Sequence, residues 1–369
     1  MSALEITVDY DAITHNVEVL RGMAEGAAVM AVVKADAYGH GLVPAAAAAR
    51  AGVRPGSALP SRARRSSLRA AGDSGRIFTW LFGTEVPARA LIAADVDMSV
   101  SSPEVLGAII AAARDLTLPA RVHLAIDTGL GREGVTLPAL PGLVDLALAA
   151  QAEGLVRIVG AWTHLAWADQ PGHETIDVQA DNFRSALMLL GERGVELEVR
   201  HIANSACTLT RPEPALRPGA PRHRDVRAPS HSRSRRARLW PAPRDGGALA
   251  GGAREGRARR PGVSYAHQYV TPYPTTLGLI SAGYADGVYR AAGNRAEVEI
   301  RGRRYTIAGR VCMDQFVVDL GPATEVREGD VATLIGPDGP TATHWAEAAD
   351  TINYEVVCRF GGLRPKESA

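Results

Sequence analysis

The sequence predicts an α/β fold in which an N-terminal (β/α)8 barrel is followed by a smaller, mostly-β C-terminal domain. Over the first 210 residues, short apolar runs alternate with helical stretches, and from Thr275 onward the pattern changes to alternation with period two. The chain has 369 residues, 46% hydrophobic and 22% charged, which is enough to bury one large core and one smaller core. We expect the barrel over residues 1–240 and the C-terminal β domain over residues 241–369.

The barrel is predicted from repeated strand-then-helix units. The helix-like segments have apolar residues at three- and four-residue spacing, whereas the strand-like runs are almost uniformly apolar. Six such units within about 200 residues favour a closed barrel over an open sheet. The strand-like runs are Ala28–Val33, Arg76–Leu81, Val96–Val100, Ala120–Ile126, Val156–His164 and Leu197–Ala203, and the clearest helix-like segments are Val105–Leu116, Leu137–Ala152 and Asp177–Gly194.

The C-terminal region has the pattern of half-buried, antiparallel strands. Val298 and Ile300 alternate with charged residues, and Phe316, Val318 and Leu320 alternate again. The pair Asp338-Gly339 is typical of a hairpin turn. These patterns predict a small domain built mainly from hairpins.

Two segments interrupt these patterns, residues 54–68 and residues 214–260. The second has few large apolar side chains among many Arg, Pro and Gly, so we expect it to supply no barrel strand. A charged run of this kind is also typical of a solvated or nucleic-acid-binding linker. Our preferred hypothesis is that both segments are translated out of frame, because GC-rich DNA read in a wrong frame gives this composition.

Composition excludes several classes of function. A formal net charge of +1 gives no global reason to expect a nucleic-acid or membrane partner. Cys207, Cys312 and Cys358 are too widely spaced for a disulfide framework, and the ten histidines form no HExxH or zinc-type spacing, so no metal is predicted. The N-terminus does not have the pattern of a signal peptide, and no apolar run could span a membrane. We expect a soluble, cytoplasmic protein.

Lys34 is the leading candidate for a catalytic residue. The chain has only two lysines, Lys34 and Lys366, against 39 arginines. Lysine can lose its proton and form a Schiff base, whereas arginine cannot. Lys34 ends the apolar run of the segment AVMAVVKADAYGHG, and catalytic groups of βα barrels follow the carboxyl ends of strands. A solvent-facing loop lysine fits the same pattern about equally well.

Several motifs in order resemble those of bacterial alanine racemases. The segment AVVKADAYGHG resembles the lysine motif that holds pyridoxal 5'-phosphate in that family. The other motifs are IDTGLGREG, THLAWAD, HIANSA, GVSYAHQY, AGYADGVYR, GRVCMDQ and TINYEVV, and together they span the chain from Ala28 to Val357 apart from the two unusual segments. The resemblance implies a TIM-like barrel, a C-terminal β domain and a homodimer with shared active sites. It implies interconversion of L- and D-alanine, which supplies D-alanine for peptidoglycan.

The resemblance also implies roles for individual residues around the cofactor. Lys34 matches the lysine that binds pyridoxal 5'-phosphate covalently. Tyr38, Ser205 and Tyr354 match groups that hydrogen-bond the phosphate. His164 matches the imidazole that packs beside the pyridine ring.

Other residues match groups that bind substrate or exchange its proton. Arg132 and the backbone of Met313 match contacts to the substrate carboxylate and to the catalytic tyrosine. Tyr265 matches a tyrosine that the partner subunit supplies. Racemisation requires a proton-exchanging group on each face of Cα, so Lys34 and Tyr265 are the expected pair of bases, with Arg132 as the cation that tunes the phenol.

These motifs also allow other interpretations. The segment GLGREG fits G-x-G-x-x-G, but the prolines at 138 and 141 disfavour a dinucleotide site. His201 either supports a site residue or is merely packed, and the first is expected. The rival functions are a non-catalytic pyridoxal-phosphate carrier, against which the C-terminal domain with its tyrosines argues, and a racemase of another small amino acid such as serine.

The chain departs from the family pattern at three places. Ala125 replaces a lysine that is often carbamylated and orients the substrate-binding arginine. Arg217-Pro218-Gly219 matches the letters of a motif whose arginine faces the pyridine nitrogen, but it lies in an unusual segment and lacks the residues that normally follow. We therefore do not assign that role to Arg217. The ending RFGGLRPKESA also differs.

Overall fold

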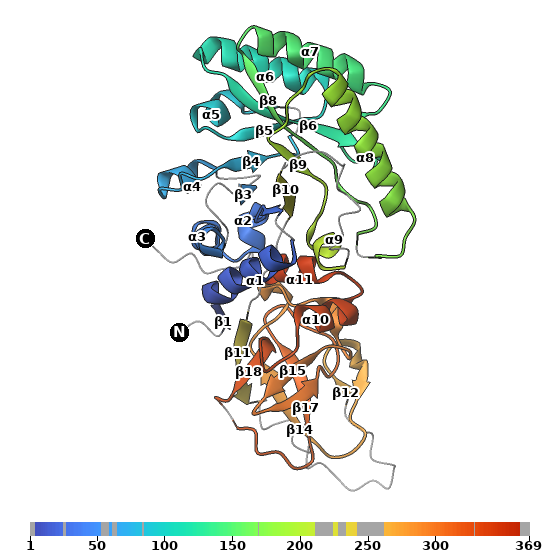
Figure 1. The fold of residues 1–369 in the computed structure, drawn as a ribbon. Helices are drawn as coiled ribbons and strands as arrows, with labels where there is room; N and C mark the ends of the chain where they lie inside the picture. The colour runs from blue at the N-terminus through green and yellow to red at the C-terminus, as the bar shows by residue number, and fades with distance from the viewer. Residues whose placement is uncertain are drawn as a thin grey trace, which may run out of the picture. The chain divides into compact units, whose positions relative to one another are not determined.

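The computed structural model describes residues 4–24, 27–52, 59–60, 65–82, 85–168, 170–210, 224–227, 234–241, 262–327 and 329–361 (Figure 1). The chain divides into two compact units. The barrel unit comprises Tyr10–Ala37 and Gly41–His231, and the β unit comprises Met1–Asp9, Tyr38–His40 and Ser232–Ala369. The predicted boundary between residues 240 and 241 falls inside a strand of the β unit.

The barrel unit is built on a curled parallel sheet whose strands follow one another in chain order. The last strand, β10, pairs with the first, β2, through Val226 opposite Ala28, which is how a βα barrel closes on itself. The predicted α/β fold class is therefore confirmed. The strands are β2 (Ala28–Val29), β3 (Leu59–Pro60), β4 (Ile77–Thr79), β5 (Asp97–Val100), β6 (Ala120–Asp127), β8 (Val156–Trp162), β9 (Val199–His201) and β10 (Arg224–Arg227), with β7 (Val135–Thr136) paired to β6.

Helices connect the strands, and α5 to α8 surround the outer side of β5, β6 and β8 in Figure 1. In α6, Ser102 accepts a hydrogen bond from the Val105 amide at the first turn, and Leu106, Ile109 and Ala113 are buried at helical spacing. The helices are α1 (Tyr10–Met23), α2 (Lys34–Tyr38), α3 (Leu42–Gly52), α4 (Arg65–Ala70), α5 (Ala88–Ala93), α6 (Pro103–Leu116), α7 (Leu140–Ala152), α8 (Thr175–Glu192) and α9 (Ser205–Thr210).

The β unit contains an antiparallel sheet in the order β16-β15-β18-β11-β14-β17, with β1 paired to β11. Phe316, Val318 and Leu320 of β17 are buried, as their alternation predicts, and Trp345 packs into the same core. The strands are β1 (Leu4–Thr7), β11 (Ser234–Pro241), β12 (Gly262–Val263), β13 (Tyr269–Val270), β14 (Thr276–Ile280), β15 (Glu297–Ile300), β16 (Arg303–Thr306), β17 (Phe316–Gly321) and β18 (Val331–Ile335), and the helices are η3 (Tyr265–His267), η4 (Tyr284–Asp286), η5 (Arg290–Ala292), α10 (Ala342–Ala349) and α11 (Asn353–Gly361).

The hairpin predicted at Asp338-Gly339 is wrong. The Gly339 amide donates a hydrogen bond to the carbonyl of Gly336, so a turn is present. That turn joins β18 to α10, because Thr341 accepts a hydrogen bond from the His344 amide and thereby starts a helix where the prediction placed a strand.

The expectation that residues 214–260 supply no barrel strand is also wrong. Arg224–Arg227 forms β10 between β9 and β2, and Ser234–Pro241 forms β11 in the other unit. Likewise, β3 and the first residues of α4 lie within residues 54–68. The remaining residues of both segments lie outside the described residues, and the hypothesis of an altered reading frame stays a prediction.

Candidate active site

Four candidate residues of the barrel unit follow the carboxyl ends of parallel strands. Lys34 follows β2, Arg132 follows β6, His164 follows β8 and Ser205 follows β9. Because the carboxyl ends of parallel strands meet at one edge of a barrel, all four lie on the edge where barrel active sites are found.

Lys34 starts a turn of unusual backbone geometry. Ala35, Asp36, Ala37 and Tyr38 all have φ between 54° and 56°, the left-handed region that costs an L-residue roughly 1–2 kcal/mol. The turn is fixed by two hydrogen bonds that Asp36 accepts: its carbonyl from the Gly41 amide at 3.0 Å and its Oδ1 from the Leu42 amide at 2.9 Å. Strain of this kind persists mainly where a functional group must be held in place.

Lys34 lies beside an aromatic cluster. Its Nζ is 6.0 Å from the centre of the Trp80 ring, and Trp80 stacks on Phe78 with ring centres 5.5 Å apart. Electrostatic interaction also couples the lysine to His164. The amine therefore faces apolar rings and an imidazole.

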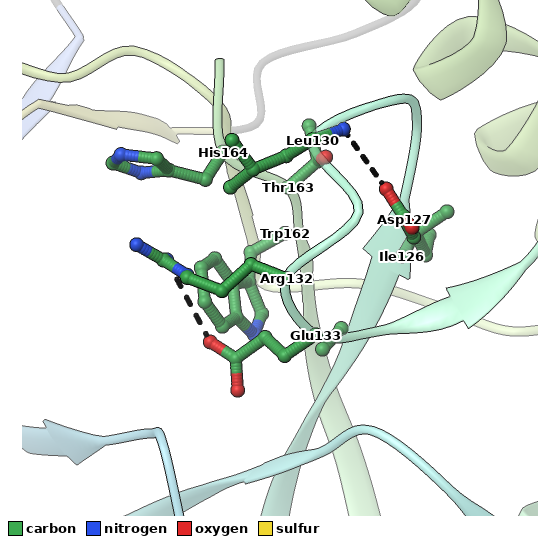
Figure 2. Close-up of a pocket in the computed structure, with 9 residues that line it drawn as sticks. Ile126, Asp127, Leu130, Arg132, Glu133, Trp162, Thr163 and His164 are labelled. Carbon is green, nitrogen blue, oxygen red and sulfur yellow. Dashed lines mark hydrogen bonds and ion pairs between the residues drawn. The ribbon is translucent and has the colours of Figure 1, made fainter. Parts of the chain in front are cut away.

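His164 is neutral at physiological pH. Burial, together with the positive charges of Arg132 and Lys34, lowers its pKa to about 4. The structure thus brings Lys34 and Arg132 within electrostatic range of His164, and Figure 2 shows Arg132 and His164 on the same side of a small pocket. A neutral imidazole at this position can pack against a ring without adding charge.

The loop after β6 holds Arg132. Asp127 Oδ1 accepts hydrogen bonds from the amides of Gly129, Leu130 and Gly131 at 2.9, 3.0 and 3.1 Å, which curls the loop back on its strand. Gly134, with φ 110°, lies so close to the backbone of Asp127 that a Cβ would be 2.6 Å from its nitrogen. The aspartate and glycines of the IDTGLGREG motif therefore shape the loop that presents the arginine.

Sequence reasoning missed Gln179, a fully buried polar residue of α8. Its Nε2 donates to the carbonyl of His164 at 3.0 Å and to Thr128 Oγ1 at 3.2 Å, while its Oε1 accepts from the Ala166 amide at 2.8 Å. The side chain joins the loop after β6 to the loop after β8. One signal was available, because Gln179 lies on the same helix face as the buried residues Ile176 and Phe183.

His201 is buried at the end of β9 in contact with a second histidine. Its Nε2 lies 3.0 Å from His123 Nδ1, and His123 Nε2 lies 3.1 Å from Asp97 Oδ2. The His201 ring also stacks on Trp162, with ring centres 5.7 Å apart and planes at 9°. The carboxylate of Asp97 bonds to Arg121 at the opposite, amino-terminal ends of the strands. His123 and His201 thus link Asp97 to Trp162, whose side chain lines the pocket beside Arg132 and His164.

Ser205 is buried at the start of α9. The preceding Asn204 accepts a hydrogen bond from the Cys207 amide through its Oδ1 at 3.0 Å, which fixes the first turn of this short helix. The HIANSA motif thereby places the serine hydroxyl in the same unit as Lys34.

In the β unit, Tyr38 and Tyr354 lie together. Their ring centres are 5.9 Å apart with planes at 49°, and Tyr354 is in the first turn of α11. Burial raises the pKa of Tyr38 above its usual range, and the neighbouring Tyr354 and Cys358 raise it further. Tyr38 therefore remains a hydroxyl donor throughout the physiological range.

Tyr265 projects from a strained turn of the β unit and is 68% exposed. Ser264, Ala266 and His267, which flank it, have φ of 61°, 60° and 46°, and the Ser264 hydroxyl donates to the carbonyl of Arg310 at 2.7 Å. The hydrogen bond of Ser264 therefore holds the turn in place, while the phenol of Tyr265 is exposed on the surface of its own unit.

The Met313 backbone packs tightly against η4. Its carbonyl accepts a hydrogen bond from the Ala285 amide at 2.9 Å, and a Cβ on Gly283 would lie 2.1 Å from that carbonyl. The side chain of Met313 is 54% exposed. Gly283, the first glycine of AGYADGVYR, is thus required for the position of Met313.

Two family models match this chain over most of its length. The model described as "Alanine racemase, N-terminal domain" matches residues 8–220, and that described as "Alanine racemase, C-terminal domain" matches residues 256–367. The chain belongs to the alanine racemase family. Residues 221–255, which match neither family model, form the greater part of the unusual segment 214–260.

Individual alanine racemases resemble the chain over nearly its whole length. The alanine racemase of Salinispora tropica is 44% identical over 98% of this chain and 96% of its own, and that of Frankia casuarinae is 43% identical over 97% and 94%. The solved structure of alanine racemase from D-cycloserine producing Streptomyces lavendulae is 40% identical and has a TM-score of 0.86 over 97% of this chain and 95% of its own.

Within the described part of the chain, no group of three or more His, Cys, Asp and Glu side chains could hold a metal ion. Nor does any helix in those residues have the length and apolarity needed to cross a membrane.

Proposed function

We propose that this chain interconverts L- and D-alanine with pyridoxal 5'-phosphate, using Lys34 and Tyr265 as its two bases. The single observation that best supports the proposal is the grouping of Lys34, Arg132 and neutral His164 at the carboxyl-end edge of the barrel. Alanine racemases generally use this cofactor, and the chain is about 43% identical to such enzymes along its length.

The residues present fit the cofactor. A phosphate requires hydrogen-bond donors, which the hydroxyls of Ser205, Tyr38 and Tyr354 can supply, and Tyr38 keeps its proton because its pKa is raised. His164 is neutral and can pack against an aromatic ring. Lys34 supplies the amine for covalent attachment.

Each base has a defined task in the proposed reaction. Pyridoxal phosphate, when bound, draws electrons away from the substrate Cα and so makes its proton acidic. Lys34 Nζ would exchange that proton on one face, and Tyr265 Oη would exchange it on the other. The guanidinium of Arg132 would bind the carboxylate and hold Cα in register with both groups.

We also propose that the enzyme acts as a homodimer, in which Tyr265 enters the site of the partner subunit. The support is its exposure of 68% on a turn that is pinned at its base. An exposed aromatic group on a fixed turn is suited to contact a second chain.

The test begins with the purified chain and added cofactor. Borohydride treatment followed by peptide mass analysis should find the cofactor on Lys34, and L-alanine should acquire deuterium at Cα in D₂O. Lys34→Ala should lose both, whereas Tyr265→Phe should keep the cofactor and lose exchange that starts from L-alanine.

Three results would contradict the proposal or its parts. Labelling elsewhere than Lys34 would contradict the cofactor assignment. Cofactor binding without exchange would favour a carrier. Faster turnover of serine than of alanine would favour a different racemase.

A further inference from the structure

We propose that Glu133 is the positioning residue of Arg132, and that its carboxylate supplies the negative charge for which Ala125 leaves no side chain. The inference rests on the proposed function, in which Arg132 binds the substrate carboxylate. It concerns a residue to which that function assigns no role.

The two side chains line the pocket of Figure 2, where a dashed line joins them. Arg132 Nη2 lies 3.8 Å from Glu133 Oε1, within the range of an ion pair. The glutamate side chain is 15% exposed and the arginine side chain 39%, so the carboxylate is the better shielded partner. An ion pair shielded on one side is screened less than one in open solvent.

The charges around the pocket make this carboxylate the natural counter-ion. Arg132 and Lys34 both act electrostatically on His164, which lines the pocket, so two positive charges lie near that imidazole. Asp127 and Glu133 are the two carboxylates that line the pocket, and Asp127 Oδ1 is occupied by three loop amides. Glu133 is the carboxylate of this pocket that forms an ion pair with Arg132.

Ala125 borders the same pocket from β6, the strand that precedes the loop of Arg132. It lies near the end of β6, is 2% exposed, and contributes only a methyl group. A charged side chain from this position would approach the arginine from the strand, whereas Glu133 approaches it from the loop. The loop can supply the charge because it is rigid: Gly134 packs on the backbone of Asp127, and β7 then pairs with β6.

The physical effect is preorganisation of the guanidinium. A long arginine side chain loses rotamer freedom when it binds a carboxylate ligand, and a fixed neighbouring charge removes part of that freedom beforehand. Removing the charge should weaken binding of a small carboxylate by about five- to tenfold.

The test uses Glu133→Gln, which keeps the shape and removes the charge. Propionate is the probe, since it has the carboxylate and methyl group of alanine without the amine. With the holoenzyme, calorimetry should show propionate bound about five- to tenfold more weakly, and KM for both alanine enantiomers should rise by a similar factor with kcat changed less than about twofold. A merely structural role would not separate KM from kcat in this way.

Glu153→Gln is the matched control, because it removes the exposed ion pair between Arg114 and Glu153 on the helices of the same unit. We expect it to leave propionate binding unchanged. Cofactor affinity and thermal stability should be the same in both variants.

Arg132→Gln distinguishes the proposed role of Arg132 from that of Glu133. If it leaves propionate binding intact, the proposed role of Arg132 fails. If it abolishes binding while Glu133→Gln has no effect, only the inference about Glu133 is wrong. Glu133→Asp serves if the glutamine variant does not fold: it should bind propionate within about threefold of the unmodified protein, and a larger loss would overturn the role of the charge.

Discussion

His123 and His201 share a hydrogen bond inside the barrel, with Nδ1 of the first 3.0 Å from Nε2 of the second. Ionised Asp97 can only accept, so His123 must donate its Nε2 proton to that carboxylate across 3.1 Å. His123 Nδ1 is then an acceptor, and His201 Nε2 must be the donor. The chain of bonds therefore fixes His201 as the Nε2–H tautomer and leaves its Nδ1 as an acceptor.

These histidines should make the fold sensitive to mild acid. Burial lowers the pKa of both His123 and His201, so the unfolded chain takes up protons near pH 6.5 that the folded protein does not bind. Their contribution to stability is thus complete above about pH 6.5 and is lost progressively as the pH falls toward their folded pKa. The free energy of unfolding should therefore be lower at pH 5 than at pH 7.5.

Urea unfolding at pH 7.5, 6 and 5 measures this effect. The His201→Gln variant, although less stable, should lose less free energy of unfolding between pH 7.5 and pH 5 than the unmodified protein. An identical pH slope in the two proteins would contradict the assignment.

Asp97→Asn should destabilise the protein by about 3–5 kcal/mol in thermal or urea unfolding. Burial alone would raise the pKa of Asp97, but the hydrogen bond from His123 and the charges of Arg76 and Arg121 together lower it strongly. Removal of its charge leaves the buried His123 without a charged acceptor, and leaves Arg76 and Arg121 with Glu198 as their carboxylate partner. Asp115→Asn is the control, because its ion pair with Arg89 is more than half exposed and should contribute less than about 1 kcal/mol.

The sequence was sufficient to predict those strands and helices whose apolar residues form a continuous run or follow helical spacing. The apolar run Val156–His164 predicted β8, and the spacing within Asp177–Gly194 predicted α8. Lys34 does lie beyond the carboxyl end of a strand, but β2 ends at Val29, four residues before the end of the predicted run Ala28–Val33.

Other features could not be read from local pattern. The strand β10 has the sequence RDVR, and it forms because β9 and β2 offer backbone partners on both sides, which outweighs propensity. The network of Asp97 joins residues far apart in the chain, each of which is a single charge at the start of a strand. No spacing rule connects such residues before the barrel is closed.

Gln179→Leu should reduce both the stability of the protein and its rate of racemisation. The substitution leaves the carbonyl of His164 and the amide of Ala166 without the partner that now joins two loops, at about 1–3 kcal/mol for each buried group. The loops bearing Arg132 and His164 should then lose their register, which raises KM and lowers kcat together. We expect at least a tenfold loss of kcat/KM, equal to about 1.4 kcal/mol.

Gln151→Leu is the matched control for that measurement. Gln151 also accepts a hydrogen bond through its side chain, from the Ile158 amide at 2.9 Å, but near the start of β8 and away from the candidate site. It should cost stability without changing kcat/KM. Equal effects of the two variants on kcat/KM would show that Gln179 acts only through general stability.

Ala35→Gly should stabilise the protein, because the turn after Lys34 places an exposed alanine at φ 54° and ψ 49°. Glycine adopts this left-handed conformation without steric cost, and the gain of roughly 1–2 kcal/mol exceeds the added entropy of the unfolded chain. The net increase in the free energy of unfolding should be about 0.5–1 kcal/mol. Ala111→Gly, on the exposed side of the right-handed helix α6, should have the opposite sign and cost about 0.5–1 kcal/mol. Urea unfolding of both variants measures the difference, and a loss of stability in both would mean that residue 35 does not keep its left-handed conformation in solution.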